Sequence, residues 1–166
     1  MSVEFLKADC QNITNERKFG LYDEEDKTPV KIKLTDENTW NATVLNNENK
    51  NILVTAIDNC IDIFRQNGEM DNRCDCMLTY DTTILFIELK NKRESWQSEG
   101  LAQIENTVKK MIEEMPDFYN GFTKRKAIVA NRKHQFPSFQ ESNIEQRQHF
   151  SSKYKMRIQF DANINL

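Results

Sequence analysis

Residues 74–90 read CDCMLTYDTTILFIELK, and the fold prediction starts from this stretch. Two β-prone runs, 74–80 and 83–90, flank a short break at Asp81-Thr82, which is the pattern of an antiparallel hairpin. Both faces of these runs are largely apolar, as is typical of strands that lie centrally in a covered sheet. The stretch therefore predicts a hairpin at the centre of a sheet.

Charged side chains gather at the open end of this hairpin. If Asp81-Thr82 is a two-residue turn, the numbers of paired residues sum to 163, and Asp75 lies opposite Glu88. Opposed Cβ atoms are about 4.5–5.5 Å apart, and alternation places Lys90 on the same face. Two facing carboxylates repel each other unless a cation lies between them, and oxygen ligands favour Mg²⁺ or Mn²⁺. The register therefore predicts a metal site with an ammonium beside it.

Helical spacing flanks the hairpin on both sides. Asn46 or Asn47 can cap a first helix, which Gly68 would end. Its apolar face would consist of Ile52, Leu53, Ala56, Ile57, Cys60, Ile61 and Phe64. A second, longer helix is predicted over about 95–115, and Pro116 marks its end.

Further strands complete the pattern. Residues 126–130 and 154–160 are predicted strands, and the runs 19–22 and 30–34 flank the acidic loop 23–27 as a hairpin. This order predicts an α/β fold in a single domain, 1–166. Within it we expect an N-terminal β-rich extension over residues 1–45 and a core over residues 46–166.

The core pattern resembles the PD-(D/E)XK, or restriction-endonuclease-like, nuclease superfamily. The resemblance covers roughly residues 46–131 and is carried by Asp75 followed, after twelve residues, by Glu88-Leu89-Lys90. It implies a mixed central sheet flanked by helices, with an αβββαβ core, and Mg²⁺-dependent cleavage of nucleic acid. Asp75 and Glu88 would hold the metal with the Leu89 carbonyl, and Lys90 would serve the attacking water. The residue before Asp75 is Cys74, where the family pattern has a proline that is often absent.

Other candidate site residues have ordinary structural explanations as well. Many family members add an acid from the first helix, and Glu48 is the best candidate, although an acid is favoured in any first helical turn. Gln103 could face the site from the second helix, or could be solvated. Lys92 and Arg93 could contact phosphates, as could the basic groups at the ends of the strand 126–130.

The composition of the chain limits which of these hypotheses are acceptable. Four cysteines among 166 residues do not indicate a disulfide scaffold, and no apolar run is long enough for a membrane span or a signal peptide, so a soluble, cytoplasmic protein is expected. Residues 1–83 carry 9 Lys/Arg against 16 Asp/Glu, and residues 84–166 carry 14 against 10, which leaves room for a basic face in the second half. Cys74 and Cys76 are predicted to share one strand face as small buried hydrophobes rather than to bind zinc. His134 and His149 have no evident partners for a catalytic triad, and Trp96 could be core or could stack on a base.

The leading functional hypothesis is a Mg²⁺- or Mn²⁺-dependent phosphodiesterase that acts on DNA. A chain of this length leaves little room for a specificity domain, so it would either form a homodimer or read nucleic-acid structure. The alternative is a catalytically silent member of the same fold that binds nucleic acid or a protein. A third possibility is an unrelated interaction domain in which the Asp75 and Glu-x-Lys pattern is accidental.

Overall fold

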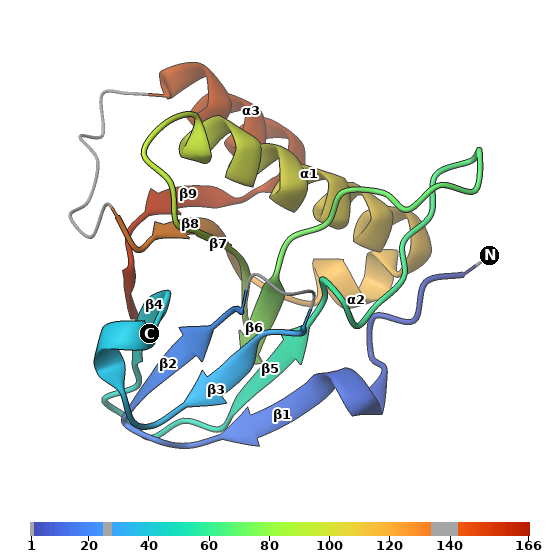
Figure 1. The fold of residues 1–166 in the computed structure, drawn as a ribbon. Helices are drawn as coiled ribbons and strands as arrows, with labels where there is room; N and C mark the ends of the chain where they lie inside the picture. Colours follow the sequence, from blue (N-terminus) through green and yellow to red (C-terminus); the bar gives the residue numbers. More distant parts are fainter. Residues whose placement is uncertain (1, 25–27, 134–142) are drawn as a thin grey trace.

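A six-stranded mixed sheet forms the centre of the molecule. We describe it from a computed structural model, which covers residues 2–24, 28–133 and 143–166. The strand order is β1-β5-β6-β7-β8-β9, and every neighbouring pair is antiparallel except β7–β8 and β8–β9 (Figure 1). Its strands are β1 (Gln11–Thr14), β5 (Ile52–Ala56), β6 (Cys76–Tyr80), β7 (Thr83–Lys90), β8 (Lys124–Asn131) and β9 (Arg157–Phe160).

A second, four-stranded sheet packs on one face of the first, and the helices cover the other face (Figure 1). The second sheet has the order β10-β4-β2-β3. Its strands are β2 (Lys18–Tyr22), β3 (Lys31–Lys33), β4 (Ala42–Leu45) and β10 (Asn163–Asn165). The helices are α1 (Trp96–Glu114), α2 (Pro116–Asn120) and α3 (Ile144–Tyr154), with short 3-10 turns at η1 (Ala8–Cys10) and η2 (Glu37–Thr39).

The central hairpin is buried on both faces, as predicted. Every residue of β7 from Thr83 to Leu89 is buried. Ile84 and Phe86 pack in the same cluster as α1, whereas Leu85 and Ile87 pack against the second sheet. Burial on both sides explains why these strands are apolar throughout rather than alternating.

The predicted helix after residue 46 is wrong. That segment contains the turn that joins β4 to β5, the strand β5 itself and a second turn over residues 57–61. Asn46 accepts the Lys50 N–H through Oδ1, and Asn49 adopts a left-handed conformation with φ 51°, which together close a tight turn. The β-branched residues that follow favour a strand, and their apolar spacing also fits a helix face, so the pattern was ambiguous.

Other predicted elements are confirmed with shifted bounds. The helix expected over about 95–115 is α1, and Pro116 begins α2 directly after it. The hairpin of β2 and β3 is present, although residues 25–27 of its loop lie outside the described part. The segment 154–160 forms a strand only from Arg157, because Tyr154 ends α3, a helix that the weakly patterned sequence did not predict.

The α/β class is observed, whereas the helix with which the predicted αβββαβ core would begin is replaced by a turn and the strand β5. β5, β6 and β7 form an antiparallel meander, and α1 leads to β8, which runs parallel to β7. The segments 1–45 and 46–166 share both sheets, since β1 pairs with β5 and β10 pairs with β4. In the described part of the chain, no helix is long and apolar enough to cross a membrane.

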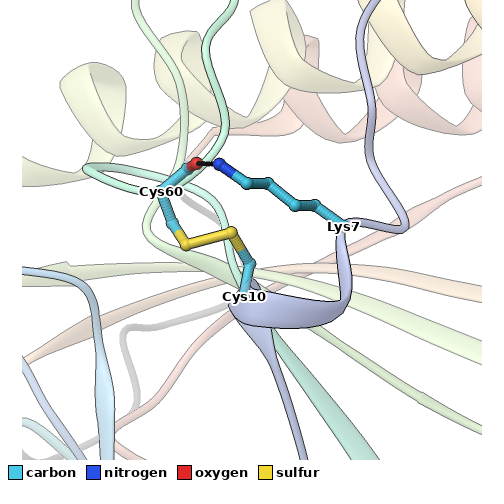
Figure 2. Close-up of a disulfide and its surroundings, with 3 residues drawn as sticks. All are labelled: Lys7, Cys10 and Cys60. Carbon is cyan, nitrogen blue, oxygen red and sulfur yellow. Dashed lines mark hydrogen bonds between the residues drawn. A yellow bond between two sulfur atoms is a disulfide. The ribbon is translucent and has the colours of Figure 1, made fainter.

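A disulfide joins Cys10 to Cys60 across 50 residues (Figure 2). The expectation that the cysteines form no disulfide framework is therefore wrong for this pair. Strand β1 pairs with β5 so that Gln11 lies opposite Thr55, which places Cys10 beside the turn that follows β5. The proximity depends on pairing between distant strands, and cysteine spacing alone contains no sign of it.

Candidate active site

The open end of the β6–β7 hairpin has the predicted register. Cys76 pairs with Ile87, and Tyr80 with Thr83. One step further along this register, Asp75 lies opposite Glu88. The pairing that was inferred from a two-residue turn at Asp81-Thr82 is therefore confirmed.

Each of the two acids binds the main chain of the opposite strand segment. The backbone N–H of Asp75 donates to Glu88 Oε2 at 3.0 Å, and the backbone N–H of Leu89 donates to Asp75 Oδ2 at 2.7 Å. Asp75 is 4% exposed and Glu88 is 3% exposed. The two carboxyl groups are thus held together in an almost closed environment, where rotation of either side chain would break a hydrogen bond.

Lys90 is the cation of this cluster. Its ammonium lies 3.4 Å from Glu88 Oε1 and donates to Gln103 Oε1 at 2.5 Å. Gln103 also donates through Nε2 to the carbonyl of Arg73 at 3.5 Å, so the amide connects α1 to both sides of the hairpin opening. Of the two residues that the sequence proposed from neighbouring helices, Gln103 is therefore at the site.

Thr107, one helical turn after Gln103, holds the segment that leads to Asp75. Its fully buried Oγ1 accepts the N–H of Cys74 at 2.9 Å and donates to the Gln103 carbonyl at 3.0 Å. Sequence reasoning missed this residue. A threonine on the buried stripe of an otherwise apolar helix face was the available signal, since a buried hydroxyl needs a hydrogen-bond partner.

Burial disfavours ionisation of both acids. It raises the pKa of Asp75 from 3.8 to about 7, with the charge of Asp23 adding to the shift and the Leu89 N–H opposing it. Burial also raises the pKa of Glu88 well above its usual range, and the charge of Asp75 adds to this while Lys90 opposes it. One ammonium does not compensate two buried carboxylates, so burial disfavours the doubly ionised pair in the absence of a further cation.

Two more acids lie near Asp75 and were not predicted. Asp23, at the end of β2, acts on the pKa of Asp75 through its charge, and Asp58 has a smaller effect of the same sign. Asp58 is bound by Arg73 at 3.1 Å, and its backbone N–H donates to the Asp75 carbonyl at 3.3 Å. Asp58 lies in the turn after β5, and Asp23 is brought in by the second sheet.

A divalent cation fits the chemistry of this donor set. Asp75 and Glu88 supply only oxygen, the type of ligand that Mg²⁺ and Mn²⁺ prefer, and a bound cation would oppose the rise in their pKa values that burial causes. Among the described residues, however, no group of three or more His, Cys, Asp or Glu side chains is arranged to hold a metal. Further ligands would have to come from water, substrate or main-chain carbonyls such as that of Leu89.

Glu48 is not part of the site. It lies in the turn between β4 and β5, with its side chain 76% exposed, and shares Lys50 with Asp81. Because Asp81 is in the hairpin turn, Glu48 is at the far end of the strands from Asp75. Its predicted place depended on the helix that the structure replaces with a strand.

The basic residues divide between the two ends of the sheet. Lys92 and Arg93 directly follow the site, and Lys92 is paired with Glu99 at 2.6 Å. The register of β8 puts Asn131 beside Lys90 and Lys124 beside Thr83, so the basic residues 124–126 lie at the turn end. They cannot extend the surface around Lys90, whereas Arg132 and Lys133 follow Asn131 on the site side.

The remaining candidates have structural roles. Cys74 and Cys76 are free and buried, as predicted, but they pack in different hydrophobic clusters rather than on one shared face. Trp96 is buried against Phe160. His149 has a partner after all, since it contacts Glu105 of α1, and His134 lies outside the described residues.

Comparison with known proteins found no match. No family model matches the chain, and neither a curated protein nor a solved structure matches it significantly.

Proposed function

We propose that the protein is a metal-dependent nuclease that hydrolyses phosphodiester bonds of DNA. The observation that carries this proposal is the meeting of Asp75, Glu88 and Lys90 at the open end of one buried hairpin. It is supported by the order of β5, β6, β7, α1 and β8 around these residues, which agrees with the resemblance to PD-(D/E)XK nucleases.

Each side chain has a distinct part in this proposal. Asp75 and Glu88 would hold Mg²⁺ or Mn²⁺, which supplies Lewis-acid activation of the phosphodiester and neutralises negative charge. Lys90 donates hydrogen bonds to the attacking water or to the phosphate oxygens as negative charge develops there. Gln103 keeps the Lys90 amine on the side of the acids, because its Oε1 accepts a hydrogen bond from that amine.

One observation favours a catalytically silent binding module as the second candidate. Asp75 and Glu88 each accept a main-chain N–H from the other's segment, so they also close the end of the hairpin without any metal. In that case their carboxylates would be structural, and the cations Lys92 and Arg93 would contact nucleic acid without cleavage.

Nicking of supercoiled plasmid with Mg²⁺ or Mn²⁺ separates the two candidates, with single-stranded and branched DNA as further substrates. We expect cleavage by the wild-type protein, none by Glu88→Gln, and unchanged cleavage by Glu48→Gln, a matched control at an exposed acid. Binding of DNA by the wild-type protein without cleavage would favour the silent module. Absence of both binding and cleavage would favour the interaction domain.

A further inference from the structure

The two cysteines of the Cys10–Cys60 disulfide differ in exposure. Cys10 is 2% exposed, whereas Cys60 is partly exposed and lines a cavity of about 510 Å³. Figure 2 shows the bond between the η1 segment and the turn after β5, with the Lys7 side chain directed at Cys60. Thiol–disulfide exchange requires in-line approach of a thiolate to one sulfur, so the partly exposed Cys60 is the reachable one.

The charges around the cavity are mixed, and one cation contacts the main chain of Cys60. The cavity is lined by Lys7, Arg65 and Lys110 together with the acids Glu4 and Asp62. Lys7 donates to the Cys60 carbonyl at 3.5 Å, which brings its ammonium to this cysteine. This ammonium attracts an anionic thiolate into the part of the cavity that Cys60 lines.

We propose that Cys60 is the site at which a small-molecule thiol opens this disulfide, and that opening releases the turn that supports Asp75. The thiolate attacks Cys60 Sγ, the Cys10–Cys60 bond breaks, and Cys10 leaves as a thiolate that takes a proton from water. The product is a mixed disulfide on Cys60. A second equivalent of the thiol then attacks the mixed disulfide, which leaves Cys60 as a free thiol and releases the oxidised small disulfide.

The turn over residues 57–61 transmits this change to the site. The N–H groups of Cys60 and Ile61 both donate to the Ile57 carbonyl, at 3.2 and 2.8 Å. The N–H of Ile57 then donates to the Asp75 carbonyl at 2.8 Å. The disulfide therefore anchors a turn that is one hydrogen bond away from a proposed metal ligand. The effect of this hydrogen bond on activity rests on the proposed function, whereas the hydrogen bond itself can be tested without it.

Peptide mapping by mass spectrometry tests the first half of the proposal. The native protein is incubated with reduced glutathione, quenched with acid and mapped. We expect glutathione on Cys60, a free thiol on Cys10, and no adduct on the buried Cys74 or Cys76. Lys7→Met should slow the adduct several-fold, and Lys7→Arg should restore the rate. An adduct on Cys10, or an adduct that forms only in denaturant, would overturn the assignment.

Hydrogen exchange tests the second half without metal or DNA, so its failure is distinct from failure of the nuclease proposal. After reduction of the wild-type protein, and separately in Cys10→Ala/Cys60→Ala, exchange at the Ile57 and Asp58 amides should rise by roughly tenfold or more. The amide of Leu78 in the central strand β6 is the internal control: it reports the global loss of stability, and after reduction it should remain better protected than the Ile57 and Asp58 amides. Unchanged exchange at Ile57 on reduction would refute the coupling to Asp75.

Discussion

Asp75 and Glu88 face each other across the open end of the hairpin, and the N–H of Asp75 donates to Glu88 Oε2 at 3.0 Å. This arrangement puts two carboxyl groups in an environment from which solvent is nearly excluded. Among the described residues, Glu88 forms its ion pair with Lys90, at 3.4 Å. One ammonium therefore faces two buried carboxyl groups.

The stability of the metal-free protein should fall as the pH rises from about 4 to 8. In the folded protein the pKa of Asp75 is raised from 3.8 to about 7, so between these values the native state binds a proton that the unfolded chain has released. The stabilisation is fully present below pH 3.8 and is lost as the pH passes 7. A shift of this size corresponds to about 4 kcal/mol. Urea unfolding at pH 5 and pH 8 measures it. Asp75→Asn should show a smaller fall, and equal pH dependence in both proteins would contradict the shift.

Asp75→Asn should raise the melting temperature of the metal-free protein at pH 8 by a few degrees, because it removes one of two repelling acids. The same variant should lose the stabilisation by Mn²⁺, which at a hundredfold excess over Kd is about 2.7 kcal/mol in the wild-type protein. Differential scanning calorimetry with and without Mn²⁺ compares them. A lower melting temperature for metal-free Asp75→Asn would instead indicate a structural ion pair with Lys90.

Lys90→Ala should separate cleavage from binding. The nuclease proposal requires the ammonium for chemistry, so cleavage should fall by roughly a hundredfold or more. DNA binding should stay within about tenfold, since one phosphate contact is lost. Lys92→Ala is the matched control, as this neighbouring lysine is 44% exposed and paired with Glu99, and it should retain cleavage within a few-fold. Equal losses of cleavage in the two variants would contradict a specific catalytic role of Lys90 and would indicate that it contributes only positive charge.

Thr107→Val should destabilise the fold by about 1–3 kcal/mol, because the buried N–H of Cys74 loses its acceptor. Thr107→Ser keeps the hydroxyl and should restore most of the lost stability. If Thr107 positions the segment before Asp75, the Val variant should also bind Mn²⁺ more weakly, as measured by titration calorimetry. Unchanged Mn²⁺ affinity would limit Thr107 to a structural role.

Reduction of the disulfide should lower the free energy of unfolding by about 4 kcal/mol, the loop-closure value for a separation of 50 residues. For a chain of this length that corresponds to a fall in melting temperature of about 10 °C. The measurement compares thermal unfolding with and without dithiothreitol. Cys10→Ala/Cys60→Ala should melt at the temperature of the reduced protein, and a response of this variant to dithiothreitol would place the effect elsewhere.

The local sequence pattern was sufficient to predict those elements in which apolar residues recur with the period of one type of secondary structure. The β6–β7 hairpin and its register followed from two apolar runs around a two-residue turn. Helix α1 followed from apolar residues at helical spacing and from Pro116 at its end. The segment 46–64 failed because the same apolar residues fit both periods, and its strand forms through pairing with β6 and β1.

The sequence by itself determined the hairpin, its register and hence the opposition of Asp75 and Glu88, because a short turn sets the pairing of the strands beside it. Only the tertiary structure decided which other residues join them. Gln103 and Thr107 reach the site because α1 packs on β7, and Asp23 approaches because the second sheet covers the opposite face. The Cys10–Cys60 bond forms because β1 pairs with β5. These contacts join residues that are tens of positions apart, so burial of distant apolar surfaces, which no local period encodes, had to bring them together.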